Sequence, residues 1–246
     1  VESISAVRTS NETKGYVYAV CYDREGSLWM GCLNGNLVQK TSEGCRYYPV
    51  NNVQAMTQLP NGQMAVGTAF GLKLITPGSQ QVQDLDYTPS GESDVTPFVT
   101  HLMVVGRYLW IATDGGGVYV YDLRARQSRQ LTTRDGLPSN HVSSLAKDRK
   151  GQVWIATVDG LAFLPSSESA KAVNVNYCYG LDCEYSRGAV AGLANGDLMF
   201  GTTTGAVIVC PDKVQPINYT AHLYIVGVSC KSSDEDSFNA QGHRML

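Results

Sequence analysis

The feature that most constrains the fold of this 246-residue chain is an internal repeat. Each copy contains an apolar stretch, a polar turn with glycine, a second apolar stretch that often contains tryptophan, a small turn ending in glycine, and a third apolar stretch. Five copies are visible, at 18–35, 53–71, 99–116, 142–160 and 189–205.

Two markers keep the same spacing through the five copies. The tryptophan position is occupied by Trp29, Ala65, Trp110, Trp154 and Met199, at intervals of 36, 45, 44 and 45 residues. A glycine follows six residues later each time, as Gly35, Gly71, Gly116, Gly160 and Gly205. Because both markers share one series of intervals, we interpret the copies as repeats of one structural unit.

Each unit predicts antiparallel strands joined by glycine-containing turns. Three strands are clear in every copy, and a weaker fourth is expected at 45–50, 81–86, 127–132 and 172–177. Four strands at a period near 44 residues are typical of a β-propeller blade. Helical solenoids would need 3.6-residue apolar periodicity, which is missing, and a β-sandwich does not repeat one glycine–tryptophan pattern five times. The sequence therefore predicts an all-β propeller of four-stranded antiparallel blades.

The expected blades cover about 17–50, 52–86, 98–132, 141–177 and 187–210, within a propeller domain at 1–212. The fifth unit runs after three strands into a proline-containing segment, which disfavours a local fourth strand. Residues 2–8 alternate like a strand, and we expect them to pair near 205–210 and close the ring. The five repeats form either a complete ring, closed by this segment, or part of a larger one.

Composition excludes several function classes. The net charge is −3 with 17% charged residues, so no basic field is present to bind nucleic acid. No apolar run approaches the ~20 residues of a membrane span. The chain opens on a valine without a basic and apolar leader, so we expect it to begin partway through a protein or after a processed leader.

The seven cysteines form no metal-type pattern, and no metal or cofactor is expected. Cys21, Cys32 and Cys210 lie in apolar runs, where a thiol acts as a small hydrophobic group. Cys178 and Cys183 are five residues apart and would form a disulfide across a loop in an oxidising compartment, or stay reduced.

The segment DGLPSNHVSSLAKDRKGQVWIATVDGLAFL (135–164) resembles the two-component regulator propeller repeat. In that family GLP-S-N, a valine strand, D-x-x-G-x-x-W-I-G/A-T and D-G-L follow in this order. The other copies are degenerate, with Cys32 in place of threonine and Ala65 and Met199 in place of tryptophan. Residues 216–230 resemble the strand that enters the triple-tyrosine β-sandwich of these sensors, so 213–246 would be the start of such a domain or a linker.

The resemblance implies the periplasmic sensor region of a hybrid two-component histidine kinase that responds to glycan breakdown products. Because propellers of this family usually close with seven blades, it also implies that the larger ring would be seven-bladed. Its partners would be an oligosaccharide ligand and a second copy in a homodimer, and its contact with the membrane would be made by a downstream segment. Kinase and phosphorelay functions would belong to downstream parts of the parent protein.

In a propeller, the turns between second and third strands and the links between blades emerge on one face, which collects variable loops. Sugar recognition needs an aromatic surface and bidentate polar groups, and this face offers both. The candidate ligand residues are Asn34, Phe70, Asp114, Asp159, Arg134, Asn140, His141, Tyr185 and Arg187. As an alternative, Asp and Asn before glycine are ordinary turn residues that bond their own backbone.

Two other functions stay open. The same fold can act as a protein-interaction scaffold without a small ligand. A glycan-cleaving enzyme is conceivable because Asp114 and Asp159 share a face, but the chain has no nucleophile elbow or zinc motif. We therefore expect no catalytic residues in this chain.

Overall fold

The computed structural model describes residues 16–89, 97–176, 180–181 and 183–214, together with the backbone of two short strands, Val228–Cys230 and Phe238–Ala240. The chain divides into two units, Val1–Val214 and Gln215–Leu246. In the second unit β20 (Val228–Cys230) and β21 (Phe238–Ala240) pair as an antiparallel hairpin. Residues 216–227 of the expected C-terminal strand lie outside the described residues.

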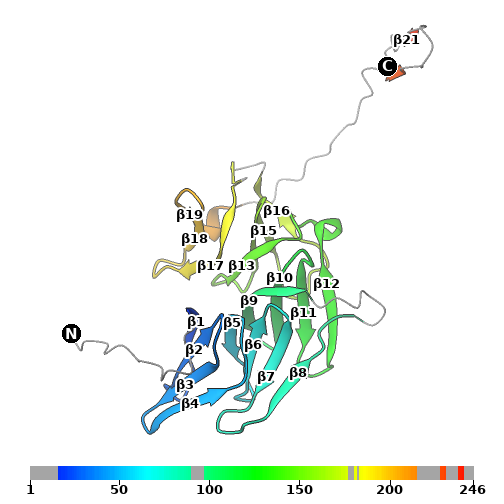
Figure 1. The fold of residues 1–246 in the computed structure, drawn as a ribbon. Coiled ribbons are helices and arrows are strands. Elements are labelled where there is room, and N and C mark those ends of the chain that lie inside the picture. The colour runs from blue at the N-terminus through cyan, green and yellow to red at the C-terminus, as the bar shows by residue number, and fades with distance from the viewer. Residues whose placement is uncertain are drawn as a thin grey trace. The chain divides into compact units, whose positions relative to one another are not determined.

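The first unit is all-β, and its sheets follow one another around a common axis as the blades of a β-propeller (Figure 1). Blade 1 contains β1 (Val17–Tyr22), β2 (Leu28–Cys32), β3 (Leu37–Thr41) and β4 (Gly44–Tyr48). Blade 2 contains β5 (Val53–Gln58), β6 (Met64–Thr68), β7 (Gly71–Ile75) and β8 (Val82–Leu85). Blade 3 contains β9 (Phe98–Val105), β10 (Tyr108–Asp114), β11 (Val118–Asp122) and β12 (Gln127–Leu131).

Blade 4 contains β13 (Val142–Lys147), β14 (Val153–Thr157), β15 (Gly160–Leu164) and β16 (Val173–Asn174). Blade 5 contains β17 (Tyr185–Gly192), β18 (Leu198–Thr202) and β19 (Ala206–Val209), so three strands of this blade are described. Two short 3-10 helices follow blades 3 and 5, at Thr133–Asp135 and Pro211–Lys213. The expected closing segment at 2–8 lies outside the described residues.

Successive blades pack through a small residue on the second strand of one blade and a bulky residue that begins the first strand of the next. A methyl group added to Gly31 would lie 2.3 Å from Cγ1 of Val53, and one added to Gly67 would lie 2.4 Å from Cγ1 of Val99. Glycine is therefore required at both positions, because side-chain packing leaves no space for a Cβ atom.

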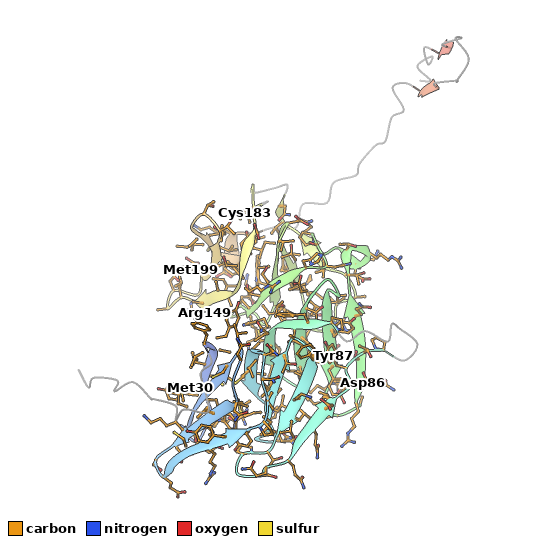
Figure 2. The ribbon with its side chains drawn as sticks, viewed as in Figure 1. Met30, Asp86, Tyr87, Arg149, Cys183 and Met199 are labelled. Atoms are coloured by element: carbon orange, nitrogen blue, oxygen red, sulfur yellow. The ribbon has the colours of Figure 1, made fainter. Side chains whose placement is uncertain are left out.

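The three tryptophans fill the spaces between blades, as their place in the repeat predicts. Trp29, Trp110 and Trp154 are fully buried, each in a separate core cluster with the following blade. Figure 2 shows the side chains between the blades, including Arg149 of blade 4, whose guanidinium donates a hydrogen bond to the carbonyl oxygen of Ala194 in blade 5.

The first strand of blade 1 differs from its counterparts in the other blades. Val17 is 51% exposed, Val20 is 63% exposed and Tyr22 is 72% exposed. The residues that correspond to Val17 are all buried, namely Val53, Val99, Val142 and Tyr185. In this structure, blade 5 therefore does not cover the face of β1 in the way that each other blade covers its successor.

Candidate functional site

The loop-rich face carries a polar cluster formed by residues of blades 3, 4 and 5. Nδ1 of His141 lies 2.5 Å from Oδ1 of Asp114. Arg187 donates to the second carboxylate oxygen, Oδ2, of the same aspartate. The guanidinium of Arg187 also lies over the ring of Phe98, 5.0 Å from its centroid. These four residues are called the Asp114 cluster below.

The turn after β10 places Asp114 at this position. In blades 2 and 4 a threonine closes a tight turn by donating to the glycine carbonyl three residues later, as Thr157 does to Gly160 at 2.9 Å. In blade 3, Thr113 donates instead to Gly117, four residues later, at 2.8 Å. The longer turn contains Gly115 and Gly117 with positive φ values of 95° and 72°, a conformation that suits glycine.

The link between blades 3 and 4 brings His141 to this turn. His141 pairs with Asp114 as an isolated β-bridge directly before β13. The carbonyl oxygen of Asn140 accepts from the backbone N–H groups of Gly115 and Gly117, at 3.1 and 2.8 Å. A methyl group added to Gly115 would lie 3.6 Å from Cε1 of His141. Backbone pairing therefore holds the imidazole against the carboxylate.

Arg187 comes from an irregular part of β17. The pairing of β17 with β18 shifts register between Tyr185 and Val190, which indicates a bulge. Bulges redirect side chains away from the regular alternation of a strand. Here the bulge leaves Arg187 exposed and directs its guanidinium across to blade 3.

The chemistry of the cluster is that of a charge-assisted network with an aromatic surface. Carboxylate–guanidinium contacts are strong and directional, and Arg187 also has a cation–π contact with Phe98. All three polar residues are at least partly exposed, so ligand hydroxyl groups can reach them. Among the described hydrogen bonds, none joins a hydroxyl or thiol to Nε2 of His141, so the Asp–His pair has no described nucleophile.

Three of the predicted ligand residues, Asp114, His141 and Arg187, thus meet in one cluster. Asn140 lies beside them in a structural role, because its Oδ1 accepts from the backbone N–H of Thr133 at 2.9 Å. The sequence reasoning missed Phe98. The available signal was an aromatic residue at the start of a first strand, directly before the valine that packs on the preceding blade.

The other predicted residues make no described hydrogen bond with the side chains of the Asp114 cluster. Arg134 is exposed in the 3-10 helix after blade 3. Asn34 and Phe70 are exposed in the turns of blades 1 and 2, and Phe70 is 72% exposed. Asp159 has a turn role: its N–H donates to Thr157 Oγ1 and its carbonyl oxygen accepts from Asn176.

Tyr185 corrects the predicted list. Its side chain is 2% exposed and makes an edge-to-face contact with Phe200, with ring centroids 5.9 Å apart. Tyr185 occupies the buried first position of β17, which corresponds to Val53, Val99 and Val142 in the preceding blades. It therefore belongs to the core between blades 4 and 5 and not to the exposed face.

The described cysteines of the propeller are free thiols, namely Cys21, Cys32, Cys45, Cys183 and Cys210. Burial raises the pKa of Cys21 to about 11, with a contribution from the charge of Asp23, and burial also raises the pKa of Cys32. Both therefore stay protonated near neutral pH and act as small apolar groups. Cys183 is a free thiol and Cys178 lies outside the described residues, so the disulfide stays a prediction.

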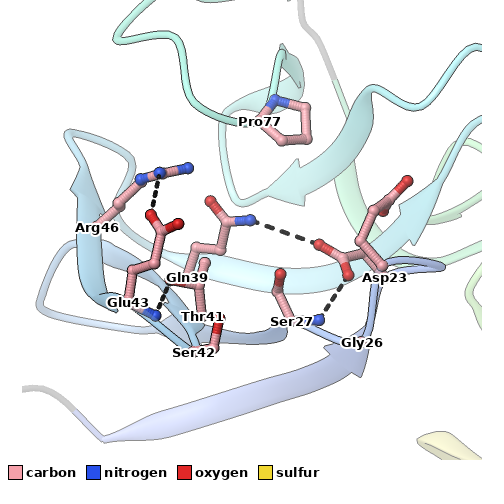
Figure 3. A pocket seen from close by; sticks show the side chains of 10 residues that line it. Asp23, Gly26, Ser27, Gln39, Thr41, Ser42, Glu43, Arg46 and Pro77 are labelled. Atoms are coloured by element: carbon pink, nitrogen blue, oxygen red, sulfur yellow. Dashed lines mark hydrogen bonds and ion pairs between the residues drawn. The ribbon is translucent and has the colours of Figure 1, made fainter.

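Two sizeable hollows lie on the opposite face, where the turns between first and second strands and between third and fourth strands emerge. One, of about 520 Å³, lies on blade 1 and is lined by polar residues that include Asp23, Gln39, Glu43 and Arg46 (Figure 3). The other, of about 550 Å³, lies between blades 2 and 3. Neither includes a predicted ligand residue, and the side chains of Asp114, His141 and Arg187 are partly exposed at the surface.

Within the part of the chain that the structure describes, no group of three or more His, Cys, Asp or Glu side chains is arranged to hold a metal ion. In the same residues, no helix has the length and hydropathy of a membrane span.

Two segments, 11–34 and 136–159, match the family model described as two component regulator propeller. These two segments of the chain are therefore similar to two-component regulator propeller repeats. Both matched segments contain the D-x-x-G-x-x-W pattern, and in each of them the tryptophan indole donates a hydrogen bond to the aspartate. Among curated proteins, none matches this chain.

Solved structures support the same fold. The extracellular domain of a Bacteroides protein, B. thetaiotaomicron BT4673, described as a hybrid two component system, has a TM-score of 0.68 at 15% identity, covering 81% of this chain and 30% of that domain. A second structure of that domain gives a TM-score of 0.67 at 16% identity and covers 88% of this chain and 32% of the domain. This repeat-containing chain therefore spans about a third of the length of those domains.

A propeller with a different function is also similar in fold. Virginiamycin B lyase from Staphylococcus aureus has a TM-score of 0.61 at 13% identity, covering 78% of this chain and 64% of the lyase. Since similar folds occur in the extracellular domain of a two component system and in a lyase, function must be argued from the site.

Proposed function

We propose that this chain is an extracytoplasmic, non-catalytic ligand-sensing propeller of a hybrid two-component system and that the Asp114 cluster recognises a glycan-derived oligosaccharide. The observation that carries the proposal is that the carboxylate of Asp114 in blade 3 contacts both His141 of blade 4 and Arg187 of blade 5. The repeats and the extracellular neighbours support the sensor class and an extracytoplasmic, periplasmic location.

The cluster has the groups that sugar binding requires. Asp114 can accept from vicinal hydroxyls, Arg187 and His141 can donate to ring or hydroxyl oxygens, and Phe98 offers an aromatic face once Arg187 moves. The polar groups now bond one another, so a ligand would exchange these contacts for its own.

The cluster also offers a route for a signal. A ligand shifts a conformational equilibrium only through its different affinities for two states. Because the three polar residues come from three successive blades, a ligand that binds them together favours one arrangement of blades 3 to 5. Blade 5 precedes the C-terminal segment that would lead to a partner domain and a homodimer.

Isothermal titration with a panel of glycan-derived oligosaccharides tests the proposal. We expect at least one to bind, and we expect Asp114→Asn and Arg187→Gln each to weaken binding by about tenfold, because each removes one charge-assisted contact. Lys171→Gln, which removes an exposed positive charge elsewhere on blade 4, serves as the matched control and should not change affinity. Melting curves of all variants show whether folding is preserved.

Two outcomes would contradict the proposal: no binding by the wild-type chain across the panel, or equal affinity in the wild type and both cluster variants. Product formation from the same oligosaccharides, lost in Asp114→Asn, would favour the enzyme alternative instead.

A protein-interaction function is favoured by the exposed face of β1. Large exposed apolar residues are concentrated there, at Tyr16, Tyr18, Val20 and Tyr22, and such patches mark interaction surfaces. Sedimentation tests this second candidate. If the face mediates association, Val20→Lys together with Tyr22→Lys should convert associated material to monomer, and an already monomeric wild type would contradict it.

A further inference from the structure

The groove between blades 2 and 3 lies on the face opposite the Asp114 cluster. Its volume is about 550 Å³, which is within the range of sites that hold small organic molecules. Its apolar floor is the outer margin of the core between these blades and is formed by Leu59, Leu74, Leu85, Tyr121 and Leu123. Asn61, Gln63 and Gln83 of blade 2 contribute neutral hydrogen-bonding groups.

Blade 3 lines the other side of the groove with Arg107, Arg124 and Arg126. Arg107 is held in position by three contacts. Its Nε lies 3.0 Å from Oδ2 of Asp122, its Nη2 donates to the Tyr108 hydroxyl at 2.8 Å, and its guanidinium lies over the Tyr108 ring at 4.9 Å. A guanidinium oriented in this way loses little freedom when it binds an anion.

Arg124 and Arg126 make no close ion pair among the described residues, although the pKa of Asp122, lowered first by hydrogen bonds from the backbone N–H groups of Ala125 and Arg124, is also lowered by the charge of Arg124. The described ion pairs include neither guanidinium. Oδ1 of Asp122 accepts from the backbone N–H groups of Arg124 and Ala125, at 2.8 and 3.1 Å, and so holds the turn. Asp84, the one acidic residue among those lining the groove, is bonded to Lys73. The groove is therefore positive on a chain whose net charge is −3.

The backbone at Arg126 is a second, independent observation. Arg126 has a φ of 54°, a left-handed conformation that is unfavourable for a residue with a Cβ atom. In blade 2 the turn between third and fourth strands contains Gly78, which also has a positive φ, of 81°. Blade 3 thus carries an arginine in a conformation that favours glycine. Strain of this kind is concentrated at functional sites.

We propose that the groove between blades 2 and 3 binds a small organic anion, with a carboxylate, sulfate or sulfonate group on Arg124 and Arg126 and an apolar body on the leucine floor. Arg107 would add a fixed donor at the end of the groove near the turn between β9 and β10. This site is separate from the Asp114 cluster in residues and in face, so it can hold its ligand whether or not an oligosaccharide binds the cluster.

Naphthalene-2-sulfonate and its neutral analogue naphthalene-2-methanol are suitable probes, because they share an apolar body and differ in charge. We expect the wild-type chain to bind the sulfonate with a dissociation constant at or below about 1 mM and the neutral analogue about tenfold more weakly. Sodium sulfate should compete with the sulfonate if the charged group supplies the difference.

The variants Arg124→Gln and Arg126→Gly locate the site. Each should weaken sulfonate binding by about five- to tenfold, and the double variant should abolish it. Arg126→Gly also separates binding from folding, because glycine accepts the positive φ and should leave the melting temperature unchanged or higher. Arg46→Gln removes an exposed arginine from β4 of blade 1 and should leave affinity unchanged, which controls for net charge.

The proposal is overturned if the wild type does not bind the sulfonate at about 1 mM, if the neutral analogue binds equally well, or if the double variant retains wild-type affinity. The last result would place the probe elsewhere, for example on the exposed face of β1.

Discussion

The indole Nε1 of Trp154 donates a hydrogen bond of 3.0 Å to Oδ2 of Asp148, six residues earlier in the chain. Trp29 and Asp23 repeat this relationship in blade 1 at 2.8 Å. In both blades the same aspartate also accepts backbone N–H groups of the turn through Oδ1. The D-x-x-G-x-x-W pattern therefore encodes one local structure, in which the aspartate accepts hydrogen bonds from the turn backbone and from a buried indole N–H.

Replacing Asp148 with alanine should destabilise the propeller strongly. The change removes the acceptor of the Trp154 indole and of the N–H groups of Lys150 and Gln152, and the indole is fully buried. Leaving such groups unpaired costs about 2–4 kcal/mol of unfolding free energy. Urea denaturation measures the effect, with Asp212→Ala as the control, because that exposed aspartate pairs with exposed Lys150 and its removal should hardly change the unfolding free energy.

Trp110 should respond differently from Trp154. Its Nε1 is buried and has no described hydrogen-bond partner. The turn before β10 is shorter than the one before β14, and β9 ends in Val104 and Val105 where blade 4 has an aspartate. Trp110→Phe removes an unpaired donor, whereas Trp154→Phe removes a paired one. We expect Trp154→Phe to lower the unfolding free energy by about 1–2 kcal/mol more than Trp110→Phe. Equal losses in urea denaturation would contradict this account.

Val17 and Val142 hold the same position in blades 1 and 4 but differ in burial. Val142 is buried against blade 3, while Val17 is half exposed. Val142→Ala should lower the unfolding free energy by about 2 kcal/mol, and Val17→Ala by less than about 0.5 kcal/mol. A large loss at Val17 in calorimetry or denaturation would show that the first strand is covered in solution.

His101 should make stability depend on pH. Nδ1 of its ring accepts from the backbone N–H of Leu145 in the next blade at 3.2 Å, and burial lowers its pKa from 6.5 to about 4. Between these values the unfolded state binds more protons than the folded state. The contribution of His101 to the free energy of unfolding is therefore complete above pH 6.5. It declines by up to about 3 kcal/mol as the pH falls toward 4.

The variant His101→Asn tests this dependence, since an amide oxygen can accept from the Leu145 N–H and does not titrate. Its unfolding free energy should change less between pH 7 and pH 4 than that of the wild type. An unchanged pH slope would assign the acid sensitivity to other groups.

Sequence alone determined the blades, because the features that define them are local. Period-2 alternation, the glycine turns and the D-x-x-G-x-x-W pattern each act within one unit of about 44 residues, and repetition made them visible. In the fifth unit, the described residues up to 214 form three strands, and the prolines near Pro211 had led us to expect no local fourth strand.

Only the tertiary structure decided which loops meet. Asp114 and Arg187 are 73 residues apart in the chain. Their side chains meet because an extended turn in blade 3 and a bulge in blade 5 direct them toward each other. The burial of Tyr185 and the exposure of Val17 were hidden for a related reason. Both residues begin first strands, and whether such a position is covered depends on the preceding blade, since contacts between blades are set by long-range packing that local patterns do not encode.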